Sequence, residues 1–194
     1  MIEIRELFPT CISIDENIML AKALLPLCDK YTALSASNCL GVENFPSTLY
    51  EKELTAQIMA EPMVQEAFGF IISHPLARLL GHRNIGFPGK HRPFGFFSSM
   101  NRWAYIDKHH HLDCYFSGLI YLDVGDDVPD LIIHDPRPVE KFLSYPKTEA
   151  TRTNASTHLI KPKTGMVLLW DSWLEHQTHQ KLNDNPRKTF VFNI

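Results

Sequence analysis

The pattern of apolar residues changes at about Phe97, and this change limits the folds that the chain can adopt. From there to the last residue the sequence consists of short apolar or alternating runs, each bounded by turn-forming residues. The runs cover residues 102–107, 116–123, 131–134, 158–161, 166–170, 177–180 and 189–194. Several short strands at this spacing are typical of an antiparallel sandwich or a jelly roll.

The residues before Phe97 predict helices after one short edge strand at 7–14. Asp15 is a suitable N-cap for a helix over 16–30, and 48–51 has the form of a capping box that opens a second helix. We therefore expect an α+β protein that is mainly β with N-terminal helices. The whole chain, 1–194, is predicted to be one domain, with a helical part over about 1–96 and a jelly-roll core over about 97–194.

Charge and composition exclude several classes of partner. The formal net charge is −3 and the isoelectric point is near 6.3, so no basic surface for nucleic acid or an anionic membrane is expected. The first residues lack the pattern of a signal peptide, and no apolar run is long enough to span a bilayer. We expect a cytoplasmic protein whose four cysteines, which form no CxxC motif, are free thiols.

The triplet His111-Leu112-Asp113 is a candidate for part of a metal site. In an extended strand, residues two apart project to the same side, so His111 and Asp113 are predicted to offer two adjacent ligands to one ion. A second histidine from a distant strand would complete the facial triad that holds non-haem Fe(II), and His176 is the candidate. One alternative stays open, in which His109 replaces Asp113 as the ligand.

Arg187 and Thr189 form a second candidate site at the start of the last predicted strand. They share a face by the same two-residue period. The planar fork of a guanidinium matches a carboxylate, and a hydroxyl beside it can donate a further hydrogen bond. The pair is suited to anchor the far end of a dicarboxylic ligand.

Taken together, these motifs resemble those of the Fe(II)/2-oxoglutarate-dependent oxygenase superfamily, and more narrowly an uncharacterised bacterial and phage group of 2OG-Fe(II) oxygenases. The resemblance lies in residues 7–10, in the histidine cluster that runs into 116–122, and in 135–137, 162–165, 172–176 and 187–193. It implies a double-stranded β-helix core, iron bound by His111, Asp113 and His176, and the C5 carboxylate of 2-oxoglutarate bound by Arg187 with Thr189. The narrow group often has His-x-His-Pro where this chain has residues 109–112, with Leu112 in place of the proline.

The resemblance also implies an activity. The chain would be a dioxygenase that uses Fe(II), 2-oxoglutarate and O2, hydroxylates an unidentified small-molecule or peptidyl substrate, and releases succinate and CO2. A retained Asp113 would leave no vacant position for a halide, which favours hydroxylation over halogenation. Asn101 and Tyr105 share the strand parity of His111 and are predicted to reach the co-substrate.

Two other functions remain open at this point. One is a cupin-like metal-dependent enzyme that does not use 2-oxoglutarate and so has no need of Arg187. The other is a non-catalytic jelly-roll binding module. The long polar segment 135–157 is predicted to be a lid or substrate loop. The sequence leaves the oligomeric state open, a homodimer included.

Overall fold

The computed structural model describes residues 3–4, 8–87, 89, 92–137 and 146–194, and its helices all precede residue 84. Helix α1 spans Ile18–Leu34, α2 spans Lys52–Ala60, α3 spans Pro62–Ile71 and α4 spans Ala77–Arg83. A short 3-10 turn covers Cys39–Gly41, and a π-helical turn, Ile72–Leu76, joins α3 to α4. None of the helices among these residues is long and apolar enough to cross a membrane.

The strands form two antiparallel sheets in the part of the chain that the structure describes. The five-stranded sheet has the order β1-β7-β4-β9-β2, and the four-stranded sheet has the order β3-β8-β5-β6. The strand bounds are β1 Ser13–Glu16, β2 Phe94–Met100, β3 Ile106–His109, β4 Phe116–Asp123, β5 Leu131–His134, β6 Thr157–Ile160, β7 Met166–Asp171, β8 His176–Thr178 and β9 Arg187–Asn193. The expectation of a mainly β protein with N-terminal helices is confirmed.

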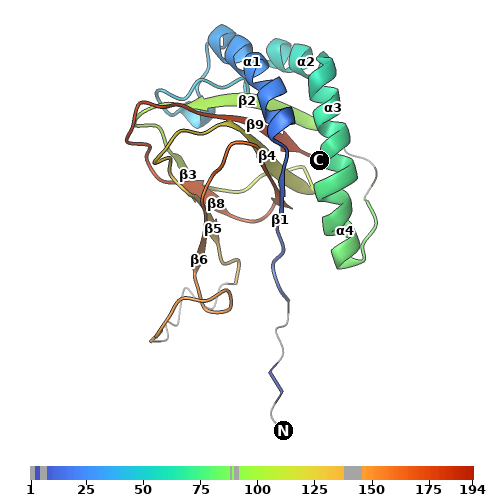
Figure 1. Ribbon diagram of the computed structural model, residues 1–194, viewed down its shortest axis with the longest axis vertical. Coiled ribbons are helices and arrows are strands. Elements are labelled where there is room, and N and C mark those ends of the chain that lie inside the picture. Colours follow the sequence, from blue (N-terminus) through green and yellow to red (C-terminus); the bar gives the residue numbers. More distant parts are fainter. Residues whose placement is uncertain (1–2, 5–7, 88, 90–91, 138–145) are drawn as a thin grey trace.

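The molecule has three layers, with helices on one face of the five-stranded sheet and the four-stranded sheet on the other (Figure 1). Side chains of β4 alternate between the two interfaces. Ile120 and Leu122 pack with α1 and α3 residues, whereas Leu119 and Tyr121 pack with residues of β5 and β6. Because both faces of the sheet are covered, β4 is buried along nearly its whole length.

The start of α1 differs from the sequence prediction. Asn17, not Asp15, is the N-cap: its Oδ1 accepts a hydrogen bond from the Leu20 amide at 3.0 Å. Asp15 lies in β1, where the chain is still extended and pairs with β7. The helix therefore begins at Ile18, two residues later than expected.

Among the described residues, two strands begin before the expected start of the core at about residue 97. Strand β1 comes from the N-terminal part but joins the edge of the core sheet, and β2 begins at Phe94, three residues before the expected limit. All four cysteines are free, as expected. Of the predicted lid segment 135–157, residues 138–145 lie outside the described residues.

Candidate metal centre

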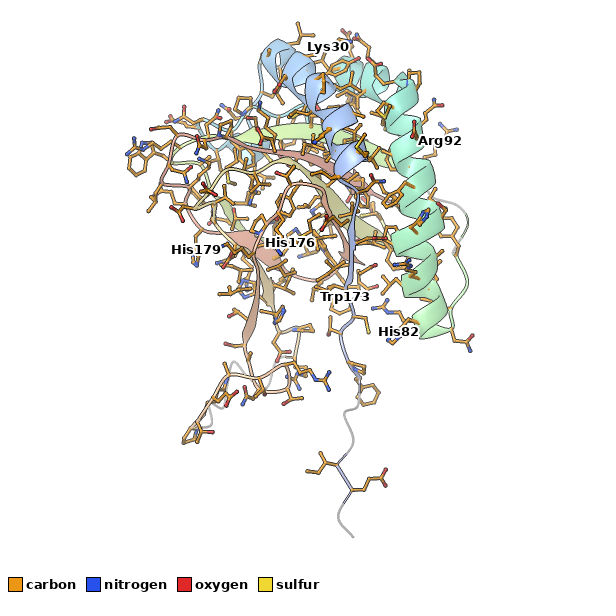
Figure 2. All side chains as sticks on the ribbon, viewed as in Figure 1. Lys30, His82, Arg92, Trp173, His176 and His179 are labelled. Carbon is orange, nitrogen blue, oxygen red and sulfur yellow. The ribbon has the colours of Figure 1, made fainter. Side chains whose placement is uncertain are left out.

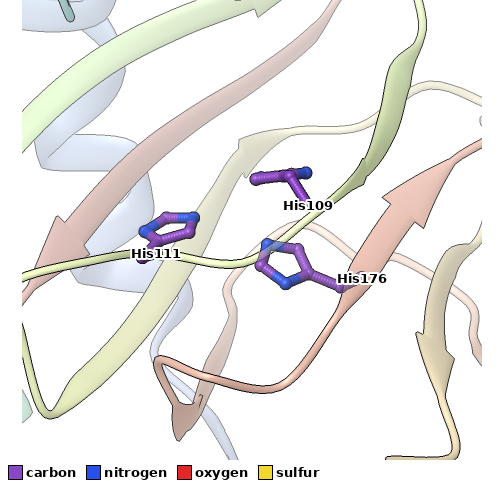
Figure 3. Close-up of side chains that lie close together, drawn as sticks. All are labelled: His109, His111 and His176. Carbon is purple, nitrogen blue, oxygen red and sulfur yellow. The ribbon is translucent and has the colours of Figure 1, made fainter.

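Three histidines face one another between the two sheets (Figure 3). His109 is the last residue of β3 and lies directly opposite His176, the first residue of β8, in the antiparallel ladder. His111 follows two residues later. Its amide donates a hydrogen bond to the Ser172 carbonyl at 2.9 Å, which holds it beside the turn that precedes β8. The candidate ligand atoms of the three side chains all lie within 4.8 Å of one another.

Each of these rings has an oxygen atom within hydrogen-bond distance of its Nδ1 atom. Nδ1 of His109 is 2.8 Å from the Asp107 carbonyl, Nδ1 of His176 is 2.9 Å from the Leu174 carbonyl, and Nδ1 of His111 is 2.6 Å from Asn193 Oδ1. Because each partner is an oxygen acceptor, each Nδ1 must carry the proton, and each Nε2 keeps its lone pair.

Burial favours the neutral form of all three rings. It lowers the pKa of His176 to about 3, and it lowers the pKa values of His109 and His111 as well. Neutral imidazoles are the form that binds a metal ion. The arrangement therefore fits a divalent ion of the kind that imidazole ligands select.

Asp113 does not join this group. Its backbone has φ of +59°, in the left-handed region, and its side chain is exposed. The extended stretch that carries His109 and His111 has ended by then, so the two-residue period does not continue to Asp113. The carboxylate borders a different, more open hollow, between the 110–116 loop and the segment after α4.

Arg187 and Thr189 lie in the same cavity as the histidines, on the inner face of β9. This cavity has a volume of about 260 Å³ and takes its lining from both sheets. Arg187 is only 3% exposed, yet its Nε and Nη1 atoms have no hydrogen-bond partner among the described residues. Burial lowers the pKa of this guanidinium, which has no carboxylate beside it in the described part of the chain. A buried cation without a counter-ion is costly, and an anionic ligand would relieve that cost.

Other polar groups around Arg187 also lack partners. Tyr121 Oη and Thr178 Oγ1 are buried with no hydrogen-bond partner among the described residues, and the Arg187 Cζ atom is 5.9 Å from the centre of the Tyr121 ring. Thr189 Oγ1 is 2.8 Å from Ser98 Oγ, which holds the hydroxyl in place. Thr178 and Thr189 line the cavity with Arg187, so their hydroxyls offer further donors to a bound anion.

The structure does not bring Asn101 and Tyr105 to this cavity. They lie in the turn between β2 and β3, where Trp103 has φ of +72°, and Tyr105 is 38% exposed. The turn breaks the strand parity on which their prediction depended. His82 and His179 are exposed and lie apart from His176 (Figure 2).

Sequence reasoning missed Tyr121, Thr178 and Asn193. Thr178 carries a usable signal, because it is two residues after His176 and must share its face. Tyr121 stands in an apolar run, where nothing distinguishes it from a core residue. The only sequence signal for Asn193 is its position an even number of residues after Arg187 and Thr189, which places it on the same face of β9.

A family model described as "Putative 2OG-Fe(II) oxygenase" matches residues 97–193. The match begins where the pattern of the sequence changes and includes every side chain named above for the cavity. No curated protein matches the chain at a significant level.

Solved structures with the same fold include three from bacteria. A prolyl-4-hydroxylase from Pseudomonas putida has a TM-score of 0.59 at 15% identity, over 95% of this chain and 92% of its own. HygX from Streptomyces hygroscopicus, with nickel, 2-oxoglutarate and hygromycin B bound, has a TM-score of 0.55 at 11% identity, over 95% and 83%. A 2OG-Fe(II) oxygenase family oxidoreductase from Burkholderia pseudomallei has a TM-score of 0.51 at 14% identity, over 87% and 76%. The jelly-roll core expected from the sequence is confirmed by these neighbours.

Proposed function

The chain belongs to the 2OG-Fe(II) oxygenase family, and from that premise we propose that it is a dioxygenase that hydroxylates a small-molecule or peptidyl substrate. The cofactors of the family are Fe(II), 2-oxoglutarate and O2, and its members are oxidoreductases. When bound, the ion and its co-substrates supply the oxidation, in which 2-oxoglutarate becomes succinate and CO2 and one oxygen atom enters a C–H bond of the substrate.

We assign the metal to Nε2 of His109, His111 and His176. These residues supply three nitrogen ligands from one side, which leaves the other positions of the ion for the co-substrates. The assignment differs from the sequence expectation by placing His109 where Asp113 was expected. It is supported by the mutual distance of the three side chains and by the exposed position of Asp113.

The observation that carries the proposal is the buried guanidinium of Arg187, which lies in the same cavity as the histidines and whose Nε and Nη1 atoms have no partner among the described residues. In this role Arg187 binds the C5 carboxylate of 2-oxoglutarate through two parallel N–H donors. Thr189, held by Ser98, donates to the same carboxylate. Thr178, which lines the same cavity, is a further donor for it. The rest of the cavity wall is largely apolar, which excludes water from the reacting centre.

The test is an anaerobic titration of 2-oxoglutarate into the Fe(II) form, followed by the visible charge-transfer absorbance of the chelate. Arg187→Ala should weaken the affinity for 2-oxoglutarate by about two orders of magnitude or more, because it removes a charge-assisted bidentate pair. Arg187→Lys restores the charge but not the fork, so its affinity should fall between those of the wild type and Arg187→Ala. Iron binding should survive both changes.

Lys188→Ala is the matched control. Lys188 is the next residue of β9, but its side chain points away from the cavity and pairs with Asp29 at 2.6 Å. It should leave the affinity for 2-oxoglutarate unchanged. If Arg187→Ala also leaves the midpoint unchanged, the co-substrate assignment is wrong, and a cupin-like metal enzyme without 2-oxoglutarate becomes the better proposal. Absence of both metal and 2-oxoglutarate binding in the wild type would favour a non-catalytic module.

A further inference from the structure

The three histidines differ in what holds their Nδ1 protons. For His109 and His176 the acceptor is a backbone carbonyl two residues earlier in the chain, Asp107 and Leu174 respectively. For His111 the acceptor is a side chain, Oδ1 of Asn193, at 2.6 Å. His111 is therefore the one of the three whose supporting hydrogen bond depends on the identity of another residue.

Asn193 is itself held with its oxygen toward His111. It stands opposite Ser117 in the ladder between β4 and β9, and Ser117 Oγ donates to the same Oδ1 atom at 2.8 Å. Ser117 Oγ is also 3.2 Å from Ser172 Oγ, and both serines are buried. The structure places the amide oxygen of Asn193 toward both groups, and because an amide oxygen only accepts, His111 Nδ1 and Ser117 Oγ are its donors.

A hydrogen-bond acceptor at this position decides which nitrogen of His111 is free. In a neutral imidazole only one ring nitrogen carries a proton, and an acceptor beside Nδ1 keeps it there. Without that acceptor the proton would lie on either nitrogen, and the fraction with Nε2 protonated could not bind a metal ion. The ring would also lose the contact that fixes its plane. The remaining hydrogen bond of His111 is made by its backbone amide and does not hold the ring.

We propose that Asn193 is a positioning residue that holds His111 in the Nδ1-protonated tautomer, with Ser117 holding Asn193 in turn. The inference rests on the proposed function for the identity of the metal ligands, but it concerns a residue that the function itself does not require. Loss of such an outer hydrogen bond typically lowers metal affinity by about 10- to 100-fold.

The experiment compares metal affinity in three variants, with Co(II) as the probe because its visible absorbance reports binding without oxidation. Asn193→Leu removes the acceptor at similar volume and should weaken Co(II) binding about 10- to 100-fold. Asn193→Asp restores an acceptor and should bind at least as tightly as the wild type. Thr164→Val is the control: it removes a hydrogen bond between Thr164 Oγ1 and the Val124 amide, away from the histidines, and should leave Co(II) affinity unchanged.

A second measurement separates positioning from a general loss of structure. In the metal-free protein with 15N-labelled histidine, His111 should show the Nδ1-protonated tautomer in the wild type and in Asn193→Asp. In Asn193→Leu its signals should move toward the other tautomer, while those of His109 and His176 stay as they are. If Asn193→Leu does not fold, Ser117→Ala, which frees the amide to rotate, should give a smaller loss of Co(II) affinity with the same direction of change at His111.

The outcomes distinguish this inference from the proposed function. If the wild type does not bind Co(II) at all, the proposed metal centre is wrong, and the inference about Asn193 is wrong with it. A wild type that binds Co(II), with unchanged affinity and an unchanged His111 tautomer in the folded Asn193 and Ser117 variants, would overturn the role of Asn193 alone. Equal losses in Asn193→Asp and Asn193→Leu would also overturn it, because the acceptor would then not be what matters.

Discussion

Three neutral imidazoles would leave the whole positive charge of a divalent ion in place, whereas a carboxylate ligand would cancel one unit of it. The cavity also holds the Arg187 guanidinium with no carboxylate beside it in the described part of the chain. Both charges therefore favour an anionic ligand that reaches from the ion to β9. A dicarboxylate such as 2-oxoglutarate has a charged group for each end.

The choice between His109 and Asp113 can be tested with paired alanine variants. His109→Ala should lower Fe(II) affinity by at least about two orders of magnitude, because it removes one of three ligands that lie together. Asp113→Ala should leave Fe(II) affinity within about threefold of the wild type, because its carboxylate is exposed. Equilibrium competition with a metal-ion indicator under anaerobic conditions measures both.

The opposite pattern, loss of iron in Asp113→Ala with retention in His109→Ala, would restore the ligand set expected from the sequence. A circular dichroism spectrum of each variant serves as the control for folding. His110→Ala is a matched substitution between the two, since His110 is exposed and is not part of the cluster.

Four of the seven residues predicted for the site lie in the cavity, namely His111, His176, Arg187 and Thr189. Their placement could be predicted because each belongs to, or directly follows, an extended segment in which side chains alternate. The same rule fails for Asp113, Asn101 and Tyr105, because the chain is not extended throughout. Trp103 has positive φ and lies between Asn101 and Tyr105, and Asp113 has positive φ itself. Propensity gives no warning of such a residue at Trp103, whereas Asp is among the few non-glycine residues that favour this conformation.

At the level of single elements, the strands were easier to predict than their limits. The buried runs of β4 and β7 read as strands because both faces of their sheet are covered. Strand β2, Phe94–Met100, is not among the runs predicted from the sequence, and Gly95 stands near its start. The structure explains that glycine: a Cβ atom there would lie 2.4 Å from the Phe190 ring. Close packing, rather than a turn, accounts for the residue, and a single sequence cannot tell these apart.

The N-cap of α1 gives a prediction on stability. Asn17→Ala should lower the free energy of unfolding by about 1 kcal/mol, because the Leu20 amide loses its acceptor at the start of the helix. Asp15→Ala should cost less, since Asp15 lies in β1 and its ion pair with Arg78 is a long 3.9 Å contact. Urea denaturation followed by circular dichroism measures both changes. A larger loss in Asp15→Ala than in Asn17→Ala would contradict this prediction.

At the level of the whole molecule, the proposed centre joins segments that are far apart in the sequence. His109 and His111 stand at the end of β3, and His176 begins β8. Only the folded protein brings these three ligands together, so the unfolded chain should bind the ion much more weakly. Binding should therefore raise the stability of the entire chain, because unfolding must release the ion.

Thermal unfolding in the presence of Co(II) checks this expectation. At a free concentration one hundred times the dissociation constant the gain is about 2.7 kcal/mol, which corresponds to a rise in Tm of roughly 5–10 °C for a chain of this size. His176→Ala should show no such rise. Added 2-oxoglutarate should raise Tm further in the wild type but not in Arg187→Ala. An equal metal-dependent rise in His176→Ala would place the ion elsewhere.

The proposed ligands and the proposed anchor belong to different sheets, which makes the cavity suitable for protein engineering. Substitutions at Arg187 and Thr189, on β9, would change which acid is accepted without touching β3 or β8. Asn193 is the exception on that strand, because it supports His111. Variants that change the first half of β9 and keep Asn193 should therefore still bind the ion. Such a library can be screened for variants that accept an acid other than 2-oxoglutarate.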